Sequence, residues 1–205
     1  MYYFLKIVFD EIFSFLFLIF LLPFLIIVSM ACLMVQGRPI FFKDLRLGKK
    51  GKPFVMIKFR TMKNGPSLSP EDDEKRLTAF GKFLRKTSID ELPVLINVLK
   101  FDMSIVGPRP LPIKYLDRFN RYQIQRLDVK PGITGLAQIN GRNKLSWEDK
   151  FSFDVEYVKK KSISLDLKII FKTFFTVILA KGVDSTNSEI MPEFMGSLED
   201  KNDKS

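Results

Sequence analysis

The sequence predicts an α+β protein that is mostly helical, with an apolar N-terminal segment ahead of one compact domain. Three observations lead to this fold class: an uncharged apolar run at 12–35, a strand–turn–strand pattern at 40–60, and helix-like apolar spacing at 163–180. The chain has 205 residues, the length of one ordinary domain, so the part after the apolar run is long enough to bury a core.

The apolar run at 12–35 is long enough to cross a bilayer and is too long for the core of a signal peptide. Pro23 lies near its middle, where the missing N–H kinks or breaks a helix. Basic residues are dense at 38–52, which places that end of the run on the cytoplasmic side. Two topologies fit: a kinked spanning helix, or a re-entrant helix–break–helix that enters and leaves on one face.

Residues 40–60 are predicted to form a β-hairpin with its turn at 48–53, because apolar positions alternate after the turn. This region is strongly basic. The basic side chains either form a solvated, lipid-facing patch, or Lys58 or Arg60 contacts a phosphate group.

The rest of the chain predicts loops and helices in alternation. We expect a polar loop at 63–75, a helix from Glu71 or Lys75 to about Arg85, and a charged helix at 112–127. The glycine-rich segment at 130–147 is expected to be an irregular, closely packed loop or a short hairpin.

The last predicted helix, at 163–180, has an apolar stripe bordered by lysines, so it belongs either to the core or to a membrane interface. The tail from Asp184 onward is polar, and Phe194 within it has no evident structural role.

The composition is basic and apolar at once, with a net charge of +10, 46% hydrophobic residues and 21 phenylalanines. This pairing is ordinary for a protein on an anionic membrane and unusual for a soluble nucleic-acid binder, so we expect no nucleic acid as a partner. Cys32 is the single cysteine, which excludes a disulfide framework. Because the chain contains no histidine, proton or nucleophile chemistry would fall to carboxylates, Lys, Tyr or a metal-bound water.

Two adjacent acids, Asp90 and Glu91, are the candidate catalytic residues. Ser88 and Glu91 match a helix capping box, which would give both acids a purely structural role. Pro93 favours a helix that begins near Asp90, and a helix N-terminus beside Arg85 would favour the ionised carboxylate. Adjacent helical residues point about 100° apart, so the two acids are expected to have different roles.

Five basic residues could pair with the phosphates of a substrate near these acids: Lys58, Arg60, Arg85, Arg109 and Arg142. A phosphate-rich substrate and a hard divalent cation held by a carboxylate fit this set of groups. The residues alone therefore predict phosphoryl transfer at a membrane surface. The alternative is a non-enzymatic, basic membrane adaptor in which the acids only cap a helix.

Three segments, "FGKFLRKTSIDELPVLINVLKFDMSIVGPRP", "KFRTM" and "VKPGITGLAQINGRN", resemble the catalytic core of the small monotopic bacterial phosphoglycosyl transferases, which start glycan assembly on polyprenol phosphate. The resemblance covers nearly the whole chain and includes an F-x-G at Phe194 and Gly196. The chain departs from the family pattern at Leu22, where Ser is common, and at Asp44, where Gln is usual.

The resemblance implies that Asp90 attacks the β-phosphate of a UDP-sugar, with Glu91 as its partner and Mg²⁺ held near the pair. UMP leaves, and undecaprenyl phosphate then takes the sugar phosphate from the aspartyl intermediate. Arg85, Arg109 and Arg142 match basic residues of the family that contact phosphate or brace the fold.

The resemblance also implies a re-entrant anchor at 1–36 that breaks at Pro23. A cytosolic catalytic domain would follow at 37–183, with interfacial amphipathic helices and the hairpin packed on a compact core, and then a polar tail at 184–205. The protein would lie on the cytoplasmic face of the bacterial inner membrane. Its partners would be the UDP-sugar, the polyprenol phosphate, membrane lipids and downstream glycosyltransferases.

Overall fold

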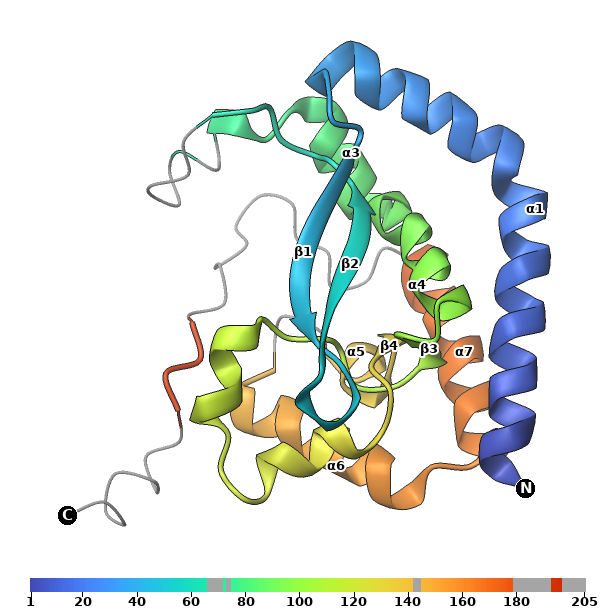
Figure 1. Cartoon of the computed structure of the whole chain (residues 1–205), viewed down its shortest axis with the longest axis vertical. Coiled ribbons are helices and arrows are strands. Elements are labelled where there is room, and N and C mark those ends of the chain that lie inside the picture. Colours follow the sequence, from blue (N-terminus) through green and yellow to red (C-terminus); the bar gives the residue numbers. More distant parts are fainter. Residues whose placement is uncertain (66–71, 73–74, 142–144, 179–192, 197–205) are drawn as a thin grey trace.

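The computed structural model describes residues 1–65, 72, 75–141, 145–178 and 193–196, and Figure 1 shows its architecture. It confirms a mostly helical α+β fold with an apolar N-terminal helix and a two-stranded hairpin. The helices and strands, in order, are α1 (Tyr2–Gln36), β1 (Phe41–Leu47), β2 (Pro53–Phe59), α3 (Ala79–Thr87), α4 (Leu95–Leu99), β3 (Ser104–Val106), β4 (Gly132–Thr134), α5 (Leu136–Ile139), α6 (Trp147–Lys160) and α7 (Ile163–Ile178).

Helix α1 exposes apolar side chains and buries polar ones, the reverse of a soluble helix. Phe20 and Met34 are 77% and 78% exposed, whereas Asp10 and Ser14 are buried against the rest of the protein. This is the described helix that is long and apolar enough to cross a membrane. An apolar surface of this extent indicates that the protein associates with a membrane.

Pro23 does not interrupt α1, which continues as one helix through it. Figure 1 shows that the helix is nevertheless bent, so that its second half leans over α3. A bend is the expected response when a proline removes one backbone hydrogen bond inside a helix. The re-entrant topology stays a prediction.

The hairpin forms as predicted, with β1 and β2 antiparallel and Phe42 directly opposite Lys58. Asn97, on α4 and fully buried, fixes the outer edge of β2: its side-chain oxygen accepts from the Ile57 N–H at 3.1 Å and its amide donates to the Val55 carbonyl at 2.7 Å. The Asn97 side chain therefore joins α4 to the hairpin, and it satisfies two backbone groups of β2 that a third strand would otherwise pair with.

The glycine-rich segment at 130–147 packs closely, as expected, but through a short parallel pair of β4 with β3. A Cβ on Gly132 would lie 2.0 Å from the Gly107 nitrogen, so only glycine permits this approach. The segment then begins α6, which the sequence analysis did not anticipate.

Two other expectations needed correction. The charged helix predicted at 112–127 is instead two short 3₁₀ helices, Ile113–Arg118 and Gln123–Asp128. Phe194 does have a structural role: it is only 2% exposed and completes an aromatic cluster.

The apolar stripe of α7 faces outward rather than into the core. Leu167 and Phe174 are 53% and 61% exposed, while Ile169 on the opposite side is fully buried. This favours the interfacial interpretation of the helix over a core role.

Candidate active site

Asp90 and Glu91 lie in a 3₁₀ helix, Ile89–Val94, between α3 and α4. Ser88 joins this helix to α3 with a left-handed backbone, φ 58°, and its side chain makes no capping hydrogen bond. The capping-box explanation of the two acids is therefore wrong. In a 3₁₀ helix neighbouring side chains diverge by about 120°, so the two carboxylates point to different surroundings.

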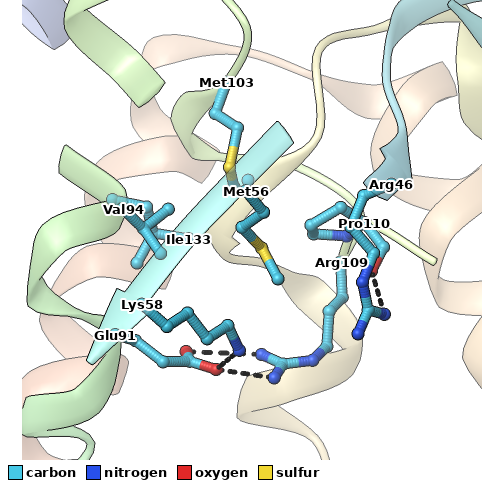
Figure 2. A pocket seen from close by; sticks show the side chains of 10 residues that line it. Arg46, Met56, Lys58, Glu91, Val94, Met103, Arg109, Pro110 and Ile133 are labelled. Atoms are coloured by element: carbon cyan, nitrogen blue, oxygen red, sulfur yellow. Dashed lines mark hydrogen bonds and ion pairs between the residues drawn. The ribbon is translucent and has the colours of Figure 1, made fainter. Parts of the chain in front are cut away.

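Glu91 is held by two cations, as Figure 2 shows. Its Oε1 accepts from the Lys58 ammonium at 2.6 Å and from the Arg109 guanidinium at 2.7 Å, and Arg109 also reaches Oε2 at 3.5 Å. Lys58 comes from β2 and Arg109 from the loop after β3, so the cluster joins three separate segments. The structure thus brings together three of the predicted site residues.

The two acids have opposite pKa shifts. Burial would raise the pKa of Glu91, but the Arg109 and Lys58 charges outweigh it and hold that pKa well below its usual range. For Asp90, burial is the largest effect and the Glu91 charge adds to it, raising the pKa from 3.8 to about 6. Arg85 favours the ionised form of Asp90, as predicted, but burial outweighs it and the net shift of the pKa is upward. Asp90 is still mainly ionised at neutral pH.

The carboxylate of Asp90 forms no hydrogen bond or ion pair with another described residue. It lies near enough to Lys58, Arg85 and Arg109 for each of these charges to lower its pKa. An anionic oxygen that is close to cations, yet bonded to none of them, is available to a substrate or a metal ion.

A small pocket of about 280 Å³, counting the solvent at its mouth, opens beside this cluster. It is lined by Arg46, Met56, Lys58, Glu91, Val94, Met103, Arg109, Pro110, Gly132 and Ile133 (Figure 2). Three cations on one side and apolar side chains on the other suit a ligand with both phosphate and less polar parts.

Arg46 is a site residue that the sequence analysis did not single out. Its guanidinium pairs with Asp44 and donates to the Pro110 carbonyl at 3.4 Å. The register of the hairpin could have identified Arg46 as a site residue. Lys58 lies opposite Phe42, and Arg46 is four residues after Phe42, so Arg46 and Lys58 share one face of the hairpin. Asp44, the departure from the family pattern, therefore contacts a residue of the pocket.

The remaining predicted basic residues do not join the pocket. Arg60 is buried and donates to the Gly37 and Arg38 carbonyls at 2.7 and 3.0 Å, so it caps the end of α1 and joins it to the hairpin. Arg85 is exposed and donates to the Thr61 hydroxyl at 3.0 Å. Arg142 lies outside the described residues.

The donor set fits a magnesium ion that is shared with a substrate better than one in a protein cage. Among the described residues, no group of three or more acidic or cysteine side chains could enclose a metal. Asp90 offers free oxygens, whereas both Glu91 oxygens already accept from cations. Mg²⁺ commonly binds through one or two protein carboxylates together with phosphate oxygens of the substrate. Asp90 and Glu91 can provide the carboxylates, and a phosphorylated substrate would provide the rest.

A pair of acids beside a cationic pocket, carried by a domain with an exposed apolar helix, is the arrangement expected of a membrane-associated enzyme that binds anionic substrates. Residues 1–180 match the bacterial sugar transferase family, and the chain belongs to that family. It is therefore a transferase, which supports the enzyme expectation over the adaptor alternative.

Three relatives illustrate the match. The chain is 52% identical over 165 residues to an uncharacterised sugar transferase, EpsL, of Bacillus subtilis, covering 78% of this chain and 81% of that protein. It is 37% identical over 193 residues to the exopolysaccharide production protein ExoY of Sinorhizobium fredii, covering 85% of each. It is 41% identical over 185 residues to a UDP-glucose:undecaprenyl-phosphate glucose-1-phosphate transferase of Klebsiella pneumoniae, covering 84% of this chain but only 40% of that longer protein.

Proposed function

We propose that the protein transfers a sugar 1-phosphate from a UDP-sugar to undecaprenyl phosphate, releasing UMP, as the first membrane step of bacterial glycan assembly. The observation that carries this proposal is the Asp90 carboxylate, which has no hydrogen-bond or ion-pair partner among the described residues and lies beside the Lys58–Glu91–Arg109 cluster. Relatives named as undecaprenyl-phosphate glucose-1-phosphate and galactose phosphotransferases support the same donor and acceptor classes.

In the first step, an Asp90 oxygen bonds to the β-phosphorus of the donor. The bond from that phosphorus to the bridging oxygen breaks, and its electron pair leaves with UMP. Lys58 and Arg109 lie where they can stabilise the negative charge of the diphosphate, since both already bind the neighbouring Glu91. The product on the enzyme is an aspartyl phosphosugar.

In the second step, a phosphate oxygen of undecaprenyl phosphate bonds to the same phosphorus. The bond to Asp90 breaks and its carboxylate is restored, so the cycle needs no net proton transfer. The acceptor is a membrane lipid, and the apolar surfaces of α1 and α7 would hold the site at the cytoplasmic face of the inner membrane.

Asp90 and Glu91, with phosphate oxygens of the donor, are the groups that would hold Mg²⁺. When bound, the ion would offset the repulsion between the carboxylate and the diphosphate. Glu91 would share its oxygens with Lys58 and Arg109, and it thereby keeps both cations beside the reacting phosphorus.

The test is UMP release by detergent-purified protein with Mg²⁺, undecaprenyl phosphate and a panel of UDP-sugars. We expect release with at least one sugar and its loss in Asp90→Asn. Asp128→Asn is the matched control, because Asp128 is exposed and does not line the pocket. Without the acceptor, one UMP per chain should appear, together with an alkali-labile sugar phosphate on the protein.

Two results would count against the proposal. Release that survives in Asp90→Asn would exclude the covalent step and leave a direct transfer. No release with any sugar, from folded protein, would exclude the reaction class itself.

A further inference from the structure

Arg126 and Asp154 form a buried ion pair just behind the pocket. Each residue is only 3% exposed, and Arg126 donates twice to one Asp154 oxygen, at 3.0 and 2.7 Å. A buried pair of charges needs excellent geometry and contributes little to stability over an apolar pair of the same size. Stability alone therefore does not explain why Arg126 and Asp154 are buried here, and a positioning role is the alternative.

The third contact of Arg126 leads into the active site. Its Nη2 also donates to the backbone carbonyl of Arg109 at 2.7 Å. Arg109 lies between Pro108 and Pro110, and its side chain binds Glu91. Fixing this carbonyl fixes the direction in which the Arg109 side chain leaves the backbone.

The Arg126 guanidinium lies against two aromatic rings, with centroid distances of 5.6 Å to both Phe119 and Phe151. Phe194, from the C-terminal segment, packs on both rings, at 4.9 Å from Phe151 and 6.1 Å from Phe119. Phe194 thereby packs against both of the rings that contact the Arg126 guanidinium.

The segment 193–196 (red in Figure 1) is attached at several points. The Phe194 N–H donates to the Tyr115 hydroxyl at 3.3 Å, and Arg118 donates to the Phe194 carbonyl at 2.5 Å. Glu193 pairs with Lys114 and Arg118 at 2.6 and 2.7 Å. Backbone and side-chain bonds together define one docked position for this short segment.

We propose that Arg126 is a positioning residue for Arg109, and that the C-terminal segment, through Phe194, holds Arg126 in place. The kinetic consequence rests on the proposed function, because it requires Arg109 to act on the donor diphosphate. The structural consequence does not: loss of Phe194 should loosen the loop that carries Arg109, whatever reaction the site performs.

The test uses the full chain with Phe194→Ala, Phe194→Leu and Arg126→Lys. Arg126→Lys keeps the charge but loses the rigid, planar guanidinium that donates to Asp154 and to the Arg109 carbonyl from Nε and Nη2. Met195→Ala is the matched control, since the Met195 side chain is 74% exposed in the same segment and its sulfur accepts only a long, weak hydrogen bond from Arg118, at 3.8 Å. Hydrogen exchange of the peptide covering 104–111 reports the loop, and UMP release at saturating donor reports turnover.

For Phe194→Ala and Arg126→Lys we expect about tenfold faster exchange at 104–111 and about tenfold lower turnover, with exchange in α4 and α7 unchanged. Phe194→Leu should show smaller changes in both the exchange at 104–111 and the turnover than Phe194→Ala does. Met195→Ala should match the unmodified protein in both measurements.

Unchanged exchange at 104–111 in Phe194→Ala would overturn the proposal. Faster exchange across the whole fold would also overturn it, because that is the result of general destabilisation. If the unmodified protein releases no UMP, the proposed function fails on that measurement, while the exchange experiment still decides the positioning role.

Discussion

Replacing Asp90 with Asn should abolish turnover and yet stabilise the fold. Burial raises the pKa of Asp90 from 3.8 to about 6, so the folded state disfavours its charged form by about two pKa units. Two units correspond to at most about 3 kcal/mol, and solvent screening of this partly exposed side chain reduces the expected effect to about 1–2 kcal/mol. An asparagine of the same size carries no charge and avoids this cost.

The sign of the pH dependence follows from the direction of the shift. Between pH 3.8 and about 6 the folded protein binds the Asp90 proton more tightly than the unfolded chain, so stability falls as the pH rises through this window. The advantage of Asp90→Asn should therefore be small at pH 4, grow up to about pH 6 and stay constant above pH 7.

Thermal unfolding of both proteins in the same detergent, at pH 4.5 and pH 8, measures this difference. We expect the variant to melt a few degrees higher at pH 8, about 2–4 °C per kcal/mol for a chain of this size, and to lose most of that advantage at pH 4.5. Equal melting temperatures at pH 8, or an advantage that does not depend on pH, would refute the burial of an ionised Asp90.

Two further predictions follow from the same geometry. Because the nucleophile must be ionised, UMP release should fall about tenfold between pH 7 and pH 5, given an Asp90 pKa of about 6; a flat profile from folded protein would contradict this. Asn97→Ala should destabilise the fold by about 2–3 kcal/mol in thermal or denaturant unfolding, because it leaves the Ile57 N–H and the Val55 carbonyl without their partner. The exposed Asn140→Ala is its control, and an equal effect of the two would exclude the bridging role.

The local patterns of the chain were predictable. Alternation specified the hairpin, and length with lack of charge specified α1, because these signals depend only on neighbouring residues. The acid pair was also identified from its chemistry and from the surrounding motif. The sequence indicated five candidate cationic partners for the acids but did not show that Lys58 and Arg109 are the two that bind Glu91. That choice depends on tertiary packing, which brings β2, the 3₁₀ helix and the loop after β3 together.

The features that sequence reasoning missed depend on distant contacts. The structural role of Phe194 cannot be predicted from its neighbours in the sequence, because its partner rings belong to segments more than 40 residues earlier. The sequence leaves Arg60 as either part of a solvated basic patch or a phosphate contact, yet in the structure it caps the carbonyl groups at the end of α1. The net upward shift of the Asp90 pKa was not predicted because charges can be counted in a sequence, whereas burial cannot.

In the proposed mechanism, the opposite pKa shifts of the two neighbouring acids explain how Asp90 could act as a nucleophile without a general base. The direct bonds of Lys58 and Arg109 go to Glu91, while Asp90 feels these cations only through their charge. A carboxylate with a pKa of about 6 is more basic, and hence a better nucleophile, than one at 3.8, while about 90% of it remains ionised at pH 7. If the Asp90 pKa were much higher, the acid would be protonated; if it were much lower, the oxygen would attack phosphorus poorly. The 3₁₀ helix achieves this division because its tight turn directs adjacent side chains to different surroundings.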